Sequence, residues 1–146
     1  MGRVYVPDGS LPWAQRYAFP PTPYLLGDEV IRVYVAFCDA EMVGRVGYVD
    51  VDASNPSRVL RVSREPVLDI GEPGAFDENG VVPTCTLEVG GRLYMYYVGY
   101  QLGVAVVRVR VAVELPDGVG LQLARHRRSR TSGRGAAASH QLSSSA

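Results

Sequence analysis

The chain has 146 residues, 47% of them hydrophobic, and its 15 Arg balance 15 Asp and Glu. This length suffices for one domain with a core, and no stretch approaches the roughly 18 consecutive apolar residues of a membrane helix. We therefore expect a soluble, cytoplasmic protein with free thiols and no membrane partner. Cys38 and Cys85 are not part of a CxxC pair, and both His lie after residue 120, so we predict no metal site. No GxxxxGK loop occurs, and we expect no cofactor.

The charge and the aromatic residues are unevenly distributed. Residues 1–103 carry 8 Arg against 13 Asp and Glu, whereas residues 104–146 carry 7 Arg against two acids. All nine Tyr, the three Phe and Trp13 lie at or before Tyr100. We therefore place the folded domain at 1–103. Residues 104–122 hold an alternating Val/Arg run that predicts an extra strand, and the Arg/Ser/Ala composition of 123–146 predicts disorder.

Turn residues recur every few positions up to Gly103, which favours short antiparallel strands over helices. In chain order we predict a hairpin over 23–37 that turns at Gly27-Asp28, a third strand over 44–52 and a fourth over 57–63. A second hairpin spans 84–98, where Gly90-Gly91 suits a two-residue type I′ turn with positive φ at both positions. The fold class is therefore all-β.

A weak internal repeat links the two hairpins. Shifting the sequence by 62 residues aligns Pro21 with Pro83, Thr22 with Thr84, Leu25 with Leu87, Ile31 with Leu93 and Tyr34 with Tyr96. The strand "RLYMYYV" is apolar on both faces, as in a sheet that neighbours cover on each side. A recurring four-stranded meander of this kind predicts blades of a β-propeller, here about two.

Four segments carry a resemblance to a known family: "PTPYLLGDEVIRVYVAFCDA", "GRVGYVDVD", "EPVLDIGEPGAFDENGVVPT" and "GRLYMYYVGY". In this order they resemble the first part of the five-bladed β-propeller glycoside hydrolase superfamily, which includes the arabinanase-like family 43 and the fructosidase-like family 32. The resemblance covers roughly residues 7–103. It implies carbohydrate as the partner and hydrolysis of a glycosidic bond by paired carboxylates in a central funnel.

The resemblance also implies site residues. Asp39, Asp77 and Glu78 are the candidate catalytic acids, with Asp77 preferred to its neighbour. Asp39 resembles the transition-state stabiliser of the fructosidase relatives, although Cys38 stands where those relatives have Arg, which predicts a carboxylate without an orienting guanidinium. Tyr17 replaces an expected histidine. Asp77 to Gly80 also fits an ordinary turn with solvated acids, and a strand-end Asp39 fits a turn equally well.

Aromatic side chains are the candidates for substrate binding: Trp13, Tyr96 and Tyr100. Trp13 also fits a plug packed on the outside of the first sheet. Both cysteines are most simply explained as buried small apolar residues.

Three functions stay open. The first is a glycoside hydrolase-like fragment that is weak or inactive alone, because a ring of five blades needs on the order of 250 residues and this chain supplies under two blades. The second is a non-enzymatic glycan-binding or interaction module. The third is a small β domain with a basic nucleic-acid-binding tail; the run at 125–128 lacks interleaved aromatic residues, so we expect no nucleic-acid partner.

The expected truncation has a suggested origin and two consequences. The family's general acid, a Glu of the third blade, has no counterpart after Gly103, and the composition of residues 104–146 suggests an out-of-frame reading of the gene. Open blade edges predict association of the chain with itself or with another chain.

Overall fold

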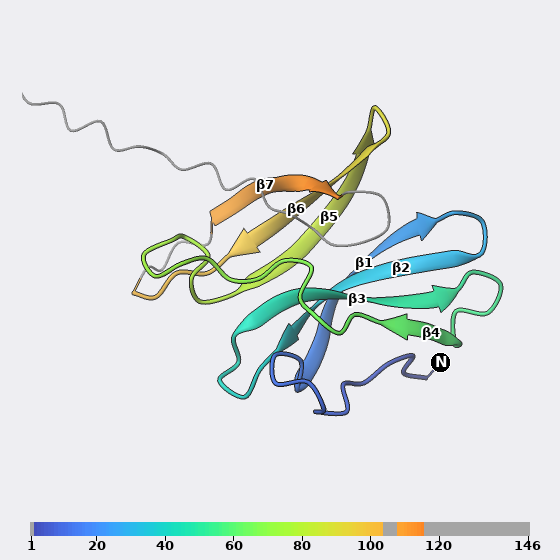
Figure 1. Ribbon diagram of the computed structural model, residues 1–146, viewed down its shortest axis with the longest axis horizontal. Coiled ribbons are helices and arrows are strands. Elements are labelled where there is room, and N and C mark those ends of the chain that lie inside the picture. Colours follow the sequence, from blue (N-terminus) through green and yellow to red (C-terminus); the bar gives the residue numbers. More distant parts are fainter. Residues whose placement is uncertain (1, 104–107, 116–146) are drawn as a thin grey trace, which may run out of the picture.

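A computed structural model describes residues 2–103 and 108–115 (Figure 1). Over these residues the protein is all-β, with antiparallel strands in two sheets and no helix, which confirms the predicted class. Sheet A contains, in spatial order, β1 (Arg16–Leu26), β2 (Val30–Cys38), β3 (Gly44–Asp52) and β4 (Val59–Val62). Sheet B contains β5 (Val81–Val89), β6 (Arg92–Gly99) and β7 (Arg108–Leu115). β7 lies within 104–122, and the tail at 123–146 lies outside the described residues.

The two hairpins form where the glycines predict them. Leu26 pairs with Val30 across a turn that begins at Gly27, which has a φ of 70°. Val89 pairs with Arg92 across Gly90 and Gly91, whose φ angles of 59° and 75° are both positive, as a two-residue type I′ turn requires.

The first strand begins earlier than predicted, at Arg16 rather than residue 23. The prolines in this stretch argue against a strand interior, but β1 is the edge of sheet A, where the outward side needs no N–H donor. Pro83 occupies the same kind of position in the edge strand β5. β3 has the predicted bounds, whereas β4 is shorter than the predicted 57–63.

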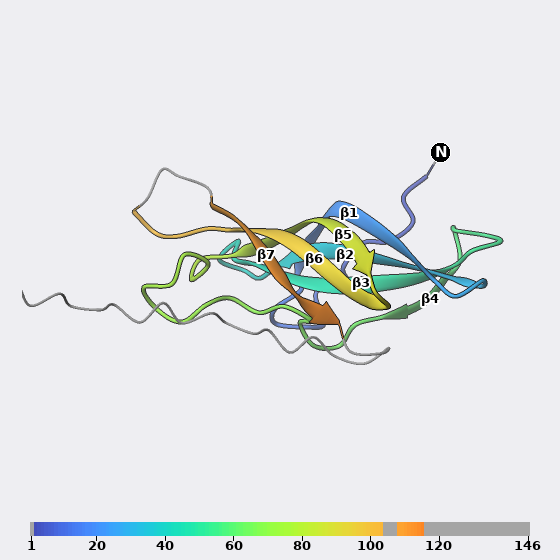
Figure 2. The same ribbon diagram turned by 90° about the horizontal axis from the view of Figure 1, so that it is seen from above.

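The core lies between the sheets. Tyr34 and Val46 of sheet A pack against Leu93, Met95 and Tyr97 of sheet B, and all five side chains are buried. β5 contacts β1, β2 and β3. Figures 1 and 2 both show β1 and β5 close together, and in Figure 1 the other strands of each sheet fan away from this pair.

A second apolar layer covers the opposite face of sheet A. Val35, Phe37, Val49 and Val51 are buried there against the N-terminal segment, residues 3–14. Within that segment Trp13 stacks edge-on against Phe37, at 5.4 Å between ring centroids, and its Nε1–H donates to the backbone oxygen of Arg64. Trp13 therefore fills the predicted role of a plug on the outside of the first sheet.

A charged cluster is buried in sheet A. The carboxylate of Asp50, a 3% exposed residue, accepts two hydrogen bonds from the 5% exposed Arg32, at 2.8 and 3.0 Å. Arg61 donates to the same carboxylate, and both guanidinium groups lie over the ring of Tyr48. Because two donors share one acceptor, the carboxylate holds β2, β3 and β4 together.

Removing this carboxylate tests how much the cluster stabilises the sheet. We expect Asp50→Ala to lower the free energy of unfolding by about 3 kcal/mol, because Arg32 stays buried without its partner. Asp69→Ala is the matched control: its side chain is 61% exposed, and its ion pair with Arg45 should contribute less than about 1 kcal/mol. Urea unfolding monitored by tyrosine fluorescence measures both; equal losses would contradict the assignment.

Candidate functional site

A hollow of about 210 Å³ opens between the sheets, at the end where β2 turns into β3. It lies among four segments that are far apart in the sequence. Phe19 comes from β1, Cys38 and Met42 from the β2–β3 turn, Asn79 and Val82 from the start of β5, and Tyr100 from the end of β6. The hollow is lined by β1 and β5, the two strands at which the sheets meet.

Two glycines let the segments approach closely enough to form the base of this hollow. A Cβ atom on Gly44 would lie 3.2 Å from the backbone oxygen of Val81. Gly80 has a φ of 140°, and a Cβ atom there would lie 3.4 Å from the nitrogen of Gly44. A side chain at Gly44 would require Val81 to shift slightly, and one at Gly80 would be strained by the positive φ of that residue.

The backbone around the hollow is irregular. Tyr17 and Met42 are the described non-glycine residues with positive φ, at 57° and 68°, and their exposed fractions are 58% and 49%. β1 also loses its register with β2 twice, between Arg16 and Phe19 and again before Thr22. Strained residues and bulges collect at functional sites, where the fold must compensate for their cost.

Two aromatic rings, Phe19 and Tyr100, contribute to the wall of the hollow. Phe19 and Tyr100 are 44% and 42% exposed, and Tyr17 meets Phe19 edge-on at 6.2 Å between ring centroids. Flat rings held by a sheet give an apolar surface with little conformational freedom to lose on binding. The side-chain amide of Asn79 and the hydroxyl of Tyr100 supply hydrogen-bonding groups at its rim.

Asp39 follows Cys38 in the chain but does not line the hollow, and its carboxylate is engaged by three donors. It accepts from Nη1 of Arg45 at 2.6 Å and from the backbone N–H groups of Glu41 and Val43. The prediction that Asp39 lacks an orienting guanidinium is therefore wrong, because Arg45, on the neighbouring strand β3, supplies one. Burial by itself would raise the pKa of Asp39, but these donors hold it below the ordinary value of 3.8.

Asp77 lies beneath the wall rather than on it. The residue is 5% exposed, and its Oδ2 accepts from the hydroxyl of Tyr97 at 2.9 Å. A Cβ atom on Gly71 would overlap Oδ1 of Asp77, and one on Gly99 would lie 2.7 Å from its Cβ. The backbone turn from Asp77 to Gly80 forms as predicted, but the expectation of a solvated carboxylate at Asp77 is wrong.

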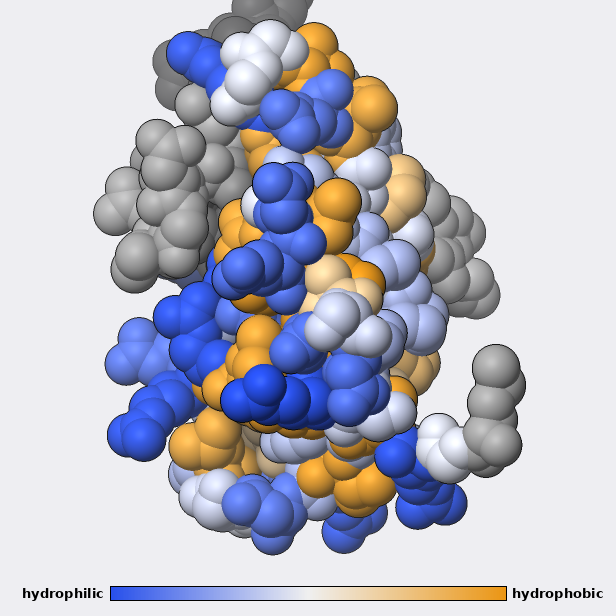
Figure 3. Space-filling view, turned by 90° about the vertical axis from the view of Figure 1, so that its right-hand side faces the viewer, coloured by the Kyte–Doolittle hydropathy of each residue, from blue (hydrophilic) through white to orange (hydrophobic). Residues whose placement is uncertain are grey.

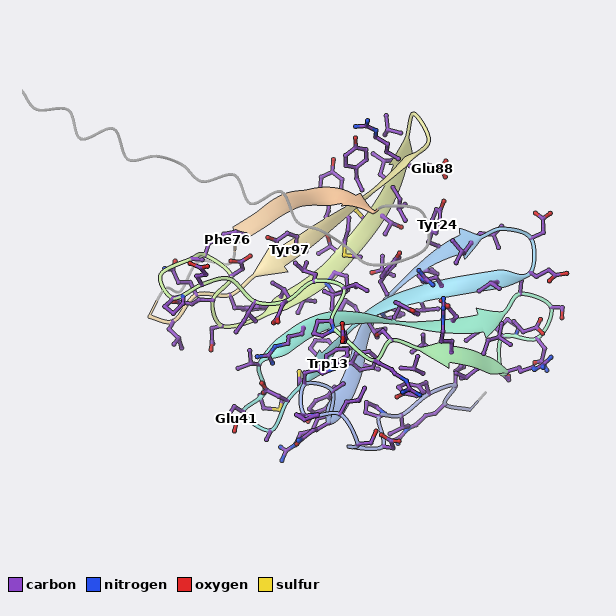
Figure 4. All side chains as sticks on the ribbon, viewed as in Figure 1. Trp13, Tyr24, Glu41, Phe76, Glu88 and Tyr97 are labelled. Atoms are coloured by element: carbon purple, nitrogen blue, oxygen red, sulfur yellow. The ribbon has the colours of Figure 1, made fainter. Side chains whose placement is uncertain are left out.

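Glu78 is a tether between two loops. Its carboxylate accepts from the backbone N–H groups of Gly74 and Leu102, which joins the segment before β5 to the segment after β6. In Figure 4, Phe76 and Tyr97 lie together near β6, in agreement with their ring contact at 5.9 Å. The two adjacent acids therefore hold the wall of the hollow in place.

The three aromatic candidates separate in space. Tyr100 lines the hollow, whereas Trp13 packs on the face of sheet A that points away from sheet B. Figure 4 shows Trp13 on sheet A, apart from Phe76 and Tyr97. Tyr96 is half-buried and alternates with the buried Met95 and Tyr97, so it lies on the outer face of sheet B. The structure thus brings Tyr100, but not Trp13 or Tyr96, to the hollow.

Sequence reasoning missed Phe19, Met42 and Asn79. The sequence identified Asn79-Gly80 as a turn but gave no reason to place Asn79 in a binding site. Nothing in the sequence predicts the positive φ of Met42. Phe19 stands beside Pro20, where the bulges of β1 break the alternation of inward and outward side chains.

Of the cysteines, Cys38 is buried as predicted, but Cys85 is exposed, contrary to the prediction. Within the described residues no three His, Cys, Asp or Glu gather to hold a metal, and no helix suits a membrane crossing.

Comparison with known proteins gives no family assignment. No protein-family profile matches the chain. The uncharacterized proteins MT1551 and Rv1502 of Mycobacterium tuberculosis, from strains CDC 1551 and H37Rv, are each 31% identical to it over 106 residues. The match covers 73% of this chain and 36% of each relative, so the chain spans about a third of the length of the curated relatives it matches.

The pairing of Asp39 with Arg45 predicts a pH dependence. Because the folded pKa lies below the unfolded value, this carboxylate stabilises the fold above pH 3.8 and the stabilisation is lost as pH falls through the folded pKa. We expect Asp39→Asn to be less stable than the wild type at pH 6, with a difference that shrinks below pH 3.8. Urea unfolding at a series of pH values measures it.

The control for this experiment is the same substitution in an Arg45→Met background. Without the guanidinium, the effect of Asp39→Asn at pH 6 should fall to the part contributed by the N–H groups of Glu41 and Val43. A difference between Asp39→Asn and the wild type that stays constant from pH 6 to pH 2 would contradict the ionic role of Asp39.

Proposed function

We propose that the chain is a glycan-binding part of a carbohydrate-active β-propeller, in which sheets A and B are successive blades. The single observation that carries the proposal is the hollow to which Phe19 and Tyr100 contribute aromatic rings, at the end of the molecule where β1 and β5 bring the sheets together. Ligands of propellers bind near the axis that their inner strands surround, and these two strands would be the inner ones. The resemblance of residues 7–103 to the propeller glycoside hydrolases points to the same place.

The contact between the sheets supports the blade assignment. Under the 62-residue shift, β6 corresponds to β2, so Leu93, Met95 and Tyr97 correspond to Ile31, Val33 and Val35. The first three face sheet A, but the second three belong to the face of sheet A that points away from sheet B. By β2 and β6 the sheets therefore meet through non-equivalent faces, as blades do around an axis; a face-to-face pair related by a two-fold axis would join equivalent faces. The shift does not extend to β1 and β5, because Leu25 pairs with Ile31, whereas their counterparts Leu87 and Leu93 lie on opposite faces of sheet B.

The chemistry of the hollow suits a sugar better than an ion or a flat apolar ligand. A pyranose or furanose ring has an apolar face of C–H groups and a rim of hydroxyls. Phe19 and Tyr100 offer the apolar surface, and Asn79 offers an amide at the edge. Apolar walls with a few polar groups are the usual composition of small-molecule sites.

Glycosidic bond hydrolysis is a second candidate, and one observation favours it. Asp39 is kept ionised by Arg45, as a nucleophile, base or charge stabiliser would be, although it follows the lining residue Cys38 and does not itself line the hollow. A glycosidase also needs a protonated acid across the bond, at roughly 5–5.5 or 6.5–9.5 Å from the first carboxylate. Asp77 and Glu78 are both tied into loops, so we propose that the chain binds glycans without cleaving them on its own.

Substitution of Tyr100 tests the binding site. We expect the chain to bind at least one member of a set of arabino-, xylo-, fructo- and manno-oligosaccharides, and Tyr100→Ala to weaken that binding about tenfold, or ~1.4 kcal/mol, because the sugar loses one wall. Leu25→Ala is the control, since Leu25 is 57% exposed beside the β1–β2 turn. Isothermal titration calorimetry measures both. Unchanged affinity in Tyr100→Ala, or no binding by the wild type, would refute the proposal.

Asp77→Asn separates binding from hydrolysis. An Asn oxygen can still accept the hydrogen bond from Tyr97, so we expect affinity for the oligosaccharide to stay within about twofold. On a panel of aryl glycosides we expect no turnover above the buffer rate from the wild type. Turnover by the wild type that Asp77→Asn abolishes, while Glu78→Gln retains it, would make Asp77 catalytic and the chain a hydrolase.

A further inference from the structure

A second cavity, of about 480 Å³, lies beside β4, and it shares no lining residue with the hollow. Its walls come from Tyr48 of β3, from Arg61 and Val62 of β4, and from residues 63–67, which follow β4. We call it the β4 cavity. Because Tyr48 and Arg61 also belong to the charged cluster around Asp50, the β4 cavity adjoins a buried ion pair.

The charged side chains at the β4 cavity leave one positive charge in excess. Arg32 and Arg61 share the single carboxylate of Asp50. Arg64 and Glu65 line the cavity as well. Three guanidinium groups therefore stand against two carboxylates. A ligand with one negative charge would make this group of side chains neutral.

Two of the three guanidinium groups keep hydrogen-bond donors for a ligand. Arg61 donates from Nε and Nη2 to one oxygen of Asp50, at 3.2 and 3.0 Å, and its side chain is 56% exposed. Its Nη1 has no acceptor among the described residues. Arg64 is exposed and forms no ion pair within the described part of the chain. Arg32, by contrast, is buried against Asp50.

The backbone that carries Arg64 is fixed by its neighbours. The N–H of Ser63 donates to the backbone oxygen of Tyr48, and the N–H of Tyr48 donates to Oγ of Ser63, each at 3.0 Å. Nε1 of Trp13 donates to the backbone oxygen of Arg64, and the N–H of Val67 donates to a backbone oxygen of β3. A ligand that binds here therefore has little backbone to order, which favours affinity.

From the excess charge and the available donors we propose that the β4 cavity binds a small organic molecule with one carboxylate group. A free guanidinium group, such as that of Arg64, matches a carboxylate through two parallel hydrogen bonds. A phosphate monoester fits less well, because it carries up to two negative charges and Glu65 repels it. Val62, Pro66 and Val67 supply apolar surface for the carbon atoms of the ligand. The inference goes beyond the proposed function and does not depend on it.

Matched ligands test the charge that the site selects. Glucuronate differs from glucose by a carboxylate in place of a hydroxymethyl group, and butyrate carries a carboxylate without a sugar. In two-dimensional amide NMR titrations of the full chain, we expect saturable shifts of the Tyr48 and Ser63 signals with at least one of these carboxylates and none with glucose. Binding of butyrate assigns a general carboxylate site, whereas binding of glucuronate alone assigns an acidic sugar. Inorganic phosphate should bind at least about fivefold more weakly than the better carboxylate.

Arg64→Gln tests the residue that the proposal needs most. It removes a charged donor and leaves the fold intact, since this exposed side chain has no ion pair among the described residues. We expect the affinity for the carboxylate to fall about fivefold or more. Arg58→Gln is the matched control, because Arg58 lies outside the cavity and its side chain is 68% exposed. It belongs to the β3–β4 turn, at the end of the molecule that faces the viewer in Figure 3, where hydrophilic side chains reach the surface.

The result is separable from glycan binding in the hollow. Tyr100→Ala should leave the affinity for the carboxylate unchanged, because Tyr100 does not line the β4 cavity. Four outcomes would each overturn the proposal, whatever the oligosaccharide titrations show: no shift with either carboxylate, equal shifts with glucose, phosphate binding as tight as that of the better carboxylate, or unchanged affinity in Arg64→Gln.

Discussion

The layer between the two sheets is the contact on which the rest of the structure depends. Tyr34 and Val46 pack on Leu93, Met95 and Tyr97, and this packing fixes where the ends of β2 and β6 lie relative to each other. The hollow is a consequence of it, because the segments that line the hollow belong to different sheets. Because protein interiors are packed as densely as organic crystals, a shift of one side chain in this layer would displace its neighbours.

The acids before β5 show how a chain can place carboxylates beside a site for structural reasons. Asp77 joins the wall segment to β6 through Tyr97, and Glu78 joins it to the backbone beyond β6. A side chain at Gly71 would overlap the Asp77 carboxylate, and one at Gly99 would overlap the Phe76 ring and the Asp77 Cβ. A buried acceptor with these fixed partners holds the wall without the freedom to exchange partners during a reaction. The acid-rich run before the aromatic hairpin is therefore explained first by the support it gives to the hollow.

The strands were predictable because their signals are local. Glycines with positive φ and runs of β-branched and aromatic residues placed both hairpins and the bounds of β3. The start of β1 was not predictable, since only the finished sheet shows that its prolines lie on an edge. The repeat paired Tyr34 with Tyr96, which both lie in the second strand of a hairpin. It could not show that the registers of the two hairpins differ by one residue.

The candidate site was less predictable, because it is made of long-range contacts. Tyr100 was found from its aromatic run. Asp39 was predicted from its place at a strand end, but it does not line the hollow. Its partner Arg45 was not found, because cross-strand neighbours depend on register. Phe19 and Met42 reach the hollow through bulges and a positive φ that no residue type in the sequence specifies. Such departures from regular geometry concentrate where function or strain outweighs local preference.

The edges and the faces of the sheets differ in how well they are protected. β1 and β5 carry prolines and bulges, and β4 has four residues, all features that hinder pairing with another strand. The faces have no such protection, since Leu87 and Val89 are exposed on one and a groove lies open on the other. Association through edges, the first expectation for an incomplete propeller, is thus opposed at β1, β4 and β5, and β7 is the remaining edge strand.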